Sequence, residues 1–425
     1  MAKKVITTRK KKMTRNRNKR YFLFICWLAC SLLVLILAHD YFMPVITKNT
    51  SSENSQSVFG TFFSKSEEEK PTTARIMAHG DLLYHDLLYM SALQPDGSYD
   101  FTENFTYVKP WIEQADLAIA DFEGTISPDF PLAGYPLFNA PAQVAQTISS
   151  AGYDVVDLAH NHILDSQLSG LISTVAAFKD VKVDSVGVYA EGNRATAPIY
   201  IREVNGIRVA ILAYAYGFNG MEGALTQEEY DGYLSDFNRQ KMQEEIEKAE
   251  KEADITIVMP QTGVEYQLEP TEEQVTLYHQ MVDWGADLVF GGHPHVAEPS
   301  ETIEKDGEKK LIIYSMGNFI SNQRMETMAG VNNYQWTERG VLMDVTVEKK
   351  DGVTCIQTVK AHPTWVSKVS KGTYSPDGFE LFTYQTLILE DFIQGGKHYG
   401  SLDEATQTRI ETAYQEMNEF MNLNW

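Results

Sequence analysis

Short apolar runs separated by amphipathic segments recur along most of this chain, starting at about residue 74. Runs at 117–120, 208–214 and 288–290 have the length and composition of buried strands. Segments such as 166–178 and 273–284 instead show the periodicity of helices that cover one face of a sheet. Strands that alternate with helices at these intervals predict an α/β protein.

The same pattern predicts the remaining elements of the body. We expect further strands at 74–78, 154–159, 255–259 and 311–314, and helices at 107–114, 143–151, 239–253 and 402–421. Beyond Gly340, residues 341–347 and 353–359 alternate between apolar and polar positions, as antiparallel strands that close a sheet would do.

The N-terminal segment has a different character. Residues 1–20 contain ten Lys or Arg and no Asp or Glu, and residues 21–38 contain no charge. As a helix, the uncharged segment would span roughly 27 Å, close to the thickness of a bilayer core. The alternative is a cleaved signal peptide, but the bulky stretch His39-Asp40-Tyr41-Phe42 does not resemble a cleavage site. We therefore predict a transmembrane signal anchor, with residues 1–20 cytoplasmic and the body extracellular.

Composition divides the chain further. A polar stretch at 47–73 predicts a stalk, followed by a main domain at 74–330 and by strands and a helix at 331–425 that complete it. The whole chain has a net charge of −22, so removing the ten basic residues of the tail leaves −32 for the remainder, which argues against nucleic-acid binding. Cys355 is the one cysteine beyond the apolar segment, which excludes an intrachain disulfide framework in the body.

Potential metal ligands follow the ends of five predicted strands. Each residue alone also fits a turn residue, a helix cap or a solvated loop. Side chains at the carboxyl ends of strands converge in open α/β sheets, however, and histidine is the commonest metal ligand. The sequence therefore predicts one shared metal site, formed by Asp81, Glu123, Asn161, Gln261, His293 and His295.

Several of these residues lie in motifs that resemble a known family. Gly80-Asp81, Asp121-Phe122-Glu123, Asn161-His162 and Gly292-His293-Pro294-His295 resemble the successive motifs of the calcineurin-like metallophosphoesterase superfamily. The stretches 158–165, 263–266, 292–296 and 314–319 resemble the CapA family more closely, in the correct order along residues 75–319. That family is associated with the synthesis and surface attachment of poly-γ-glutamate capsules in bacteria. The resemblance implies a four-layer α/β/β/α sandwich with two stacked sheets.

The resemblance also implies roles for individual residues. Asp81 would bind one divalent ion, Glu123 would bridge two ions, Asn161 would bind the second, and His293 and His295 would complete the sites. The metal, one ion or two, would be Mn, Zn, Mg or Fe, and would activate water for attack on a phosphoester. Catalytic candidates within the motifs are His162, which would assist the leaving group, together with Asp165 and Glu265.

Two departures from the family pattern leave the activity open. Leu83 stands where the superfamily has a histidine, and Gln261 stands near the position of a CapA-family histidine. An amide oxygen is a weaker ligand than imidazole for zinc. The chain is therefore expected to be a membrane-anchored hydrolase or transferase that acts on a surface polymer such as poly-γ-glutamate. The alternatives are a non-catalytic scaffold subunit of a polymer synthase complex, and a metal-dependent phosphodiesterase unrelated to capsules.

Overall fold

The computed structural model describes residues 70–421, 423 and 425. The predicted basic tail, the transmembrane segment and nearly all of the stalk lie outside these residues. Among the helices that are described, none is both long and apolar enough to cross a bilayer.

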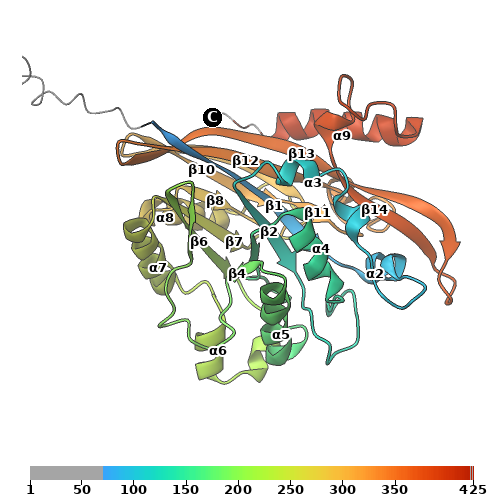
Figure 1. The fold of residues 1–425 in the computed structure, drawn as a ribbon, viewed down its shortest axis with the longest axis horizontal. Coiled ribbons are helices and arrows are strands. Elements are labelled where there is room, and N and C mark those ends of the chain that lie inside the picture. Colours follow the sequence, from blue (N-terminus) through green and yellow to red (C-terminus); the bar gives the residue numbers. More distant parts are fainter. Residues whose placement is uncertain (1–69, 422, 424) are drawn as a thin grey trace, which may run out of the picture. The chain divides into compact units, whose positions relative to one another are not determined.

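The body contains two mixed sheets (Figure 1). The eight-stranded sheet has the order β14-β13-β12-β1-β2-β3-β4, and β11 pairs with β1 beside this path. Its strands β1 to β4 run parallel, whereas β12 to β14 are antiparallel. These strands are β1 (Thr72–Leu83), β2 (Leu117–Glu123), β3 (Val155–Asp157), β4 (Asp184–Val186), β11 (Asn318–Ile320), β12 (Arg339–Lys350), β13 (Val353–Tyr374) and β14 (Glu380–Ile388).

The six-stranded sheet has the order β5-β6-β7-β8-β10-β9. Its four central strands are parallel, and β5 and β9 form antiparallel edges. The α/β class predicted from the pattern of strands and helices is therefore confirmed. The strands are β5 (Ile201–Val204), β6 (Ile207–Ala215), β7 (Ile255–Gln261), β8 (Leu288–Phe290), β9 (Ala297–Lys305) and β10 (Glu308–Met316).

Alternate side chains along the strands of the six-stranded sheet pack on its two opposite faces, and both faces are buried. On β6, Val209, Ile211 and Ala213 pack with residues of the eight-stranded sheet. Their neighbours Ala210 and Leu212 pack in a second cluster with α7 (Arg239–Glu252) and α8 (Glu272–Trp284). Successive side chains of a strand point to opposite faces, so this sheet is enclosed between the other sheet and a helix layer.

Helices also cover the eight-stranded sheet. Phe178 of α5 (Gln167–Asp180) packs edge-to-face on Phe122 of β2, with ring centroids 5.3 Å apart. The helix α4 (Gln143–Ala151) joins the same core, and α9 (Glu404–Met421) packs along β13 and β9. The remaining short elements are α2 (Asp86–Ala92), α3 (Lys109–Ile112), α6 (Gln227–Tyr233), η1 (Thr102–Phe105), η2 (Met221–Ala224), η3 (Tyr334–Trp336) and η4 (Leu389–Asp391).

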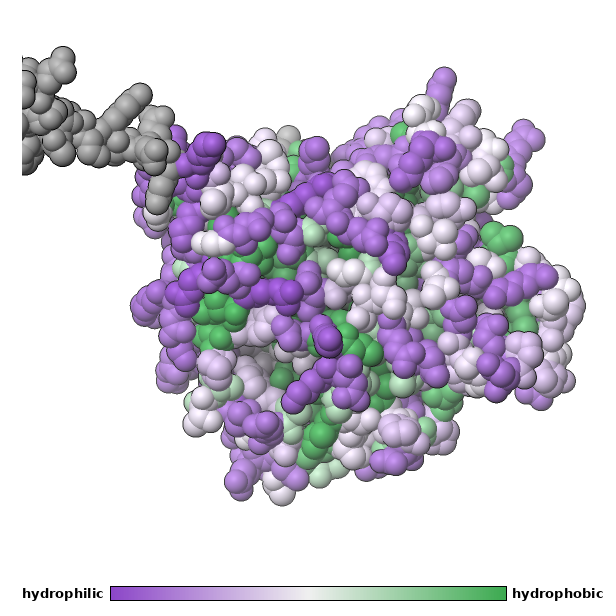
Figure 2. Space-filling view, in the orientation of Figure 1, coloured by the Kyte–Doolittle hydropathy of each residue, from purple (hydrophilic) through white to green (hydrophobic). Residues whose placement is uncertain are grey.

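Several strands extend beyond their predicted ends, β1 and β13 the furthest. We expected a strand at 74–78 that ends before Asp81, but β1 continues to Leu83 because Asp81 pairs with Asn318 of β11. We expected a strand at 353–359, but β13 continues to Tyr374 because its second half pairs with β14. Pairing with a neighbouring strand supplies the extra hydrogen bonds, and the periodicity within one segment does not reveal which strand will pair with it. Over most of the surface visible in Figure 2, hydrophilic side chains surround smaller apolar patches.

Candidate metal centre

Three aspartates lie side by side across the parallel strands of the eight-stranded sheet. Asp81 of β1 pairs with Asp121 of β2, which pairs with Asp157 of β3, and all three are buried. Burial raises the pKa of Asp121 well above its ordinary value, and repulsion from Asp81 and Asp157 adds to the effect. Like charges directly opposite one another destabilise a sheet. This row therefore requires protons or a cation.

Sequence reasoning assigned a role to Asp81 but not to Asp121 or Asp157. The available signal was that each of these aspartates follows an apolar strand segment, as Asp81 does. Equal register across three neighbouring strands is what brings them together, and register is set by tertiary pairing.

His295 lies against this acidic row. Its Nδ1 is 2.8 Å from Asp81 Oδ2, 3.2 Å from Asn318 Oδ1 and 3.9 Å from Glu123 Oε2. Burial lowers the pKa of His295, but Glu123 and the hydrogen bond to Asp81 outweigh burial and raise it to about 10. Burial raises the pKa of Glu123 to about 7. A protonated His295 thus offsets part of the negative charge when no other cation does so.

The residues present fit a divalent cation. Asp81, Glu123 and His295 each offer a ligand atom within 4.8 Å of the others. Asp81 Oδ1 and both carboxylate oxygens of Glu123 are buried without a hydrogen-bond partner, which is costly for a carboxylate. A side chain at Gly292 would place its Cβ 3.0 Å from Asp121 Oδ2 and 3.3 Å from Asp81 Oδ1, so glycine leaves this space free. Oxygen donors with one imidazole suit several metals, so this set does not select one of them.

The loop that carries His293 and His295 is strained. The two residues have φ angles of 98° and 57°, a region that non-glycine residues rarely adopt. Such strain is common at functional sites, where the surrounding structure maintains it. Gly291 is required before them, because a Cβ there would lie 2.0 Å from the carbonyl oxygen of Tyr314.

His293 is available as a ligand. Its Nδ1 is buried without a partner, and its ring lies 6.1 Å from that of His295. Burial lowers the pKa of His293 to about 3, with further lowering by His295 and His162. The ring is therefore neutral at physiological pH, which is the form that binds metals.

The two predicted amide ligands pair with each other. Asn161 donates its backbone N–H to Gln261 Oε1 at 3.0 Å, and Gln261 Nε2 donates to Asn161 Oδ1 at 2.9 Å. Asn161 Nδ2 also donates to Asn219 Oδ1 at 3.3 Å, a neighbour that the sequence did not suggest. These amide oxygens have partners, unlike the oxygens of Glu123.

His162 and Asp165 form a hydrogen-bonded pair beside the cluster. Their Nδ1 and Oδ2 atoms are 2.7 Å apart, and the same Oδ2 accepts the Phe138 N–H at 2.6 Å. The other nitrogen, His162 Nε2, lies 3.9 Å from Glu123 Oε1. Burial lowers the pKa of His162, but Asp165 and Glu123 outweigh it and raise the pKa overall. His162 can therefore carry a proton at neutral pH, as a general acid must.

Glu265 does not join the buried group. It is exposed, on the loop that follows β7. Its negative charge nevertheless contributes to the raised pKa of Glu123, after burial and Asp81. The structure thus brings together Asp81, Glu123, Asn161, His162, Asp165, Gln261, His293 and His295, and it places Glu265 nearby at the surface.

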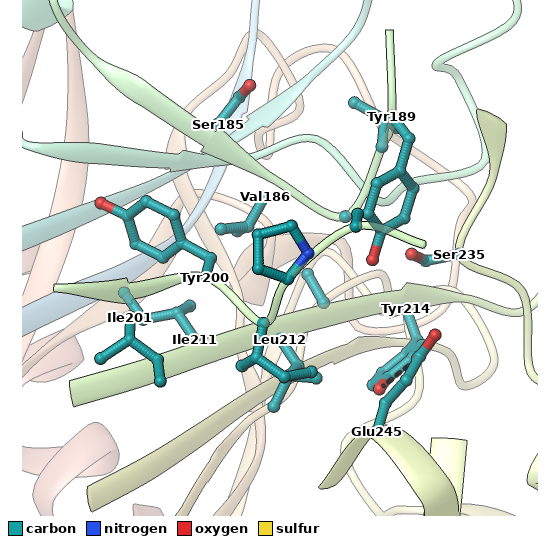
Figure 3. A pocket seen from close by; sticks show the side chains of 16 residues that line it. Ser185, Val186, Tyr189, Tyr200, Ile201, Ile211, Leu212, Tyr214, Ser235 and Glu245 are labelled. Carbon is teal, nitrogen blue, oxygen red and sulfur yellow. Dashed lines mark hydrogen bonds between the residues drawn. The ribbon is translucent and has the colours of Figure 1, made fainter. Parts of the chain in front are cut away.

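A separate cavity of about 400 Å³ lies between β4, β6 and α7 and shares no residue with this cluster (Figure 3). Two of its polar side chains, Tyr214 and Glu245, already have partners. Tyr214 donates its hydroxyl to Glu245 Oε2 at 2.8 Å, and Arg194 Nε donates to Glu245 Oε1 at 3.0 Å. With these groups paired, the cavity offers no counterpart to the unpartnered oxygens at the strand ends.

Comparison with curated proteins gives relatives named for capsule synthesis. The capsule biosynthesis protein CapA of Bacillus anthracis is 32% identical over 228 residues, covering 52% of this chain and 54% of that protein. The PGA biosynthesis protein CapA of Bacillus subtilis is 29% identical over 224 residues, covering 52% and 57%. The matched region thus spans about half the length of these relatives.

Similar solved structures are more distant. A phosphatase from Mycoplasma pneumoniae has a TM-score of 0.41 and 14% identity, covering 69% of this chain and 94% of that one. The calcineurin-like phosphoesterase YfkN from Bacillus subtilis has a TM-score of 0.40 and 16% identity, covering 83% and 100%.

The family model described as bacterial capsule synthesis protein PGA_cap matches residues 75–323. This region contains every residue of the cluster, from Asp81 to His295. The chain therefore belongs to the bacterial capsule synthesis protein PGA_cap family.

Proposed function

We propose that this protein is a membrane-anchored, extracellular metallophosphoesterase-like enzyme that acts in the assembly or attachment of a capsule polymer of the poly-γ-glutamate type. The observation that carries the proposal is the buried group of Asp81, Glu123 and His295, whose unpartnered carboxylate oxygens call for a divalent cation. Family membership and the names of the relatives support the link to capsule polymer.

The residues of the site have different chemical roles in the proposed reaction. A divalent ion held by Asp81, Glu123 and His295 would supply Lewis-acid stabilisation of a phosphoryl group and lower the pKa of water. His162 lies next to the cluster, and in its protonated form it can deliver a proton to a leaving oxygen. Asp165 accepts from Nδ1 and fixes the ring, so that Nε2 carries the proton to be transferred.

The proposed activity is testable by metal analysis and hydrolysis. Full-length protein in detergent, loaded with Mn²⁺, should retain at least one ion per chain and hydrolyse bis(p-nitrophenyl) phosphate. His162→Gln should retain the metal yet lose about 100-fold in turnover, as removal of a general acid does. Retained metal with no hydrolysis by the wild type under any divalent ion would contradict the enzymatic proposal.

The proposed location rests on residues 1–38. A basic segment followed by 18 uncharged residues supports an anchor with the body outside. Protease added to intact cells should degrade the body while the membrane remains sealed. Full protection of the body under those conditions would reverse the proposed topology.

A second candidate, a non-catalytic polymer-binding or scaffold subunit, is favoured by one observation. The mutual hydrogen bonds of Asn161 and Gln261 leave fewer free donors for a second ion. A scaffold would bind its synthase partners equally well with and without the His162→Gln substitution. Loss of capsule in cells that carry His162→Gln, with normal protein levels, would exclude a purely structural role.

A further inference from the structure

Aromatic side chains surround the metal centre, one beside each of its three histidines. The ring of Tyr216 lies 4.7 Å from that of His293, and the ring of Tyr266 lies 6.1 Å from that of His295. Phe138 packs 4.8 Å from His162, and Tyr135 lies 6.5 Å from Phe138. We call Tyr135, Tyr216 and Tyr266 the tyrosine rim.

The rim is accessible although the ligands beneath it are not. Tyr135 is 79% exposed and Tyr216 is 46% exposed, whereas His293 and His295 are buried. Contiguous exposed apolar groups, unlike single exposed side chains, mark binding sites. Leu137, Val264 and Met325 are also exposed and lie on the loops next to the rim residues or on the loop that contacts Tyr266.

Hydrogen bonds fix the most constrained member of the rim. Tyr266 has a φ of 64°, in the left-handed region. Its N–H donates to Pro294 O at 2.8 Å, its carbonyl accepts from Asn333 Nδ2 at 2.8 Å, and its hydroxyl accepts from Gln323 Nε2 at 3.2 Å. A strained backbone held by two hydrogen bonds, with a third at the hydroxyl, indicates a ring that is preorganised.

The charged residues of the rim loops disfavour one kind of ligand, a polyanion. The loops 133–139, 216–222 and 262–268 contain no Lys or Arg, and their charged residues are Glu222 and Glu265. A polyanion along these loops would meet Glu222 and Glu265 and no basic side chain. Repulsion of this kind is weakened by salt but not reversed.

We propose that the tyrosine rim binds the uncharged, ring-bearing groups on either side of a single phosphodiester, and so selects such a diester against polyanionic chains. The inference rests on the proposed phosphoesterase function, and the group bound at the rim is the phosphodiester, not the anionic poly-γ-glutamate chain. The anionic phosphate would lie at the metal centre, where Asp81, Glu123 and His295 hold the cation. The CH faces of flanking sugar-like rings would stack on Tyr216 and Tyr266, since aromatic faces bind such surfaces without charge.

A matched pair of non-reacting probes tests the selection directly. Diphenyl phosphate and bis(4-carboxyphenyl) phosphate share one phosphodiester, but the second carries two additional carboxylates. Calorimetric titration of the Mn²⁺-loaded full-length protein should show at least tenfold tighter binding of diphenyl phosphate. Tyr216→Ala and Tyr266→Ala should each weaken that binding about tenfold, the scale of one stacking contact.

Controls separate the rim from the metal centre. Tyr216→Phe keeps the ring and should bind like the wild type, as should Tyr399→Ala, which removes a tyrosine that is 52% exposed outside the rim. Metal content and the affinity for inorganic phosphate should be unchanged in the rim variants.

Three outcomes would overturn the proposal. If the carboxylated diester binds as tightly as diphenyl phosphate, the selection against charge is wrong. If the rim variants bind diphenyl phosphate as the wild type does, the rim does not bind the flanking groups. In both cases the proposed function survives, provided that inorganic phosphate still binds. If neither inorganic phosphate nor either diester binds the metal-loaded protein, the proposed function fails and this inference fails with it.

Discussion

Among the buried histidines of the described residues that lie between two carboxylates, His295 and His362 have surroundings that differ in one respect. His295 lies 2.8 Å from Asp81 and 3.9 Å from Glu123. His362, on β13, lies 2.7 Å from Glu390 and 3.4 Å from Asp344. We call these the His295 cluster and the His362 cluster.

The His362 cluster includes an arginine. Arg75 donates from two nitrogens to the two oxygens of Asp344, each at 2.8 Å, so both carboxylate oxygens have partners. In the His295 cluster, Asp81 Oδ1 and both oxygens of Glu123 have none. A buried ion pair contributes to stability only when its remaining polar atoms are also satisfied. The His362 cluster therefore resembles a structural ion pair, and the His295 cluster resembles a ligand set for a cation.

The largest expected effect concerns metal affinity. The double variant His293→Ala/His295→Ala removes both imidazole donors and should weaken Mn²⁺ binding at least about 100-fold, more than loss of a supporting contact does. The matched control is His362→Ala, which should leave Mn²⁺ affinity unchanged although it alters a similar histidine. The Mn²⁺ content that each variant retains after dialysis measures both expected effects. Equal Mn²⁺ content in the double variant and the wild type would mean that the His295 cluster is not the metal site. The contrast with the His362 cluster would then no longer hold.

The same kind of substitution should have opposite effects on stability in the two clusters. Asp344→Asn breaks the ion pair with Arg75 and should lower the free energy of unfolding by about 3 kcal/mol. Glu123→Gln removes a buried carboxylate without partners, and should raise the free energy of unfolding of metal-free protein by about 1 kcal/mol at pH 8. The sign follows from the raised pKa of Glu123, about 7, since ionisation above that pH is costly in the folded state.

Urea unfolding in the presence of EDTA measures both changes. A loss of stability in Glu123→Gln comparable to that in Asp344→Asn would mean that the His295 cluster is also a structural network.

The sequence pattern predicted one cluster and not the other for a physical reason. Asp81, Glu123 and His295 each follow or end an apolar strand, and parallel strands bring their carboxyl ends to one edge. Asp344 and His362 lie within antiparallel strands, and their meeting depends on the register between β12 and β13. Periodicity gives the presence of these strands, but it does not give their register.

Some features of the site also required the structure. The left-handed conformation of His293 and His295, and the close approach of Gly291 to the backbone of Tyr314 just before them, are seen only in the structure. The pairing of Asn161 with Gln261 joins residues 100 positions apart. Sequence motifs named both residues as metal ligands, but they could not indicate that the two amides would bond to each other.

Stability of the His362 cluster should depend on pH. Burial lowers the pKa of His362, but Asp344 and Glu390 outweigh it and raise the pKa from 6.5 to about 9. A raised pKa stabilises the fold fully below the unfolded value and loses that contribution as pH rises through the folded value. The free energy of unfolding should therefore fall between about pH 7 and pH 10, and it should fall less in His362→Gln.

Urea denaturation at several pH values in EDTA isolates this effect from metal binding. If the wild type and His362→Gln lose stability in parallel, the charge of His362 does not contribute to the fold.

The smallest expected effect concerns Gln261. Its amide is hydrogen-bonded, although it lies in the group of residues whose carboxylate oxygens have no partner. Its side-chain amide donates a hydrogen bond of 2.9 Å to Asn161 Oδ1, so that this oxygen already has a partner. Gln261→His would release that oxygen and add an imidazole, a better ligand than an amide for a transition metal. Mn²⁺ content should then rise toward two ions per chain, with about tenfold tighter binding of the second ion. Turnover of a phosphodiester should rise in parallel, since two ions stabilise both sides of the phosphoryl group. Gln323→His is the matched control for metal content, because Gln323 is another buried glutamine and is not a predicted ligand. A folded Gln261→His variant with neither added metal nor added turnover would favour the scaffold, because the amide pair would then be a structural feature like the His362 cluster.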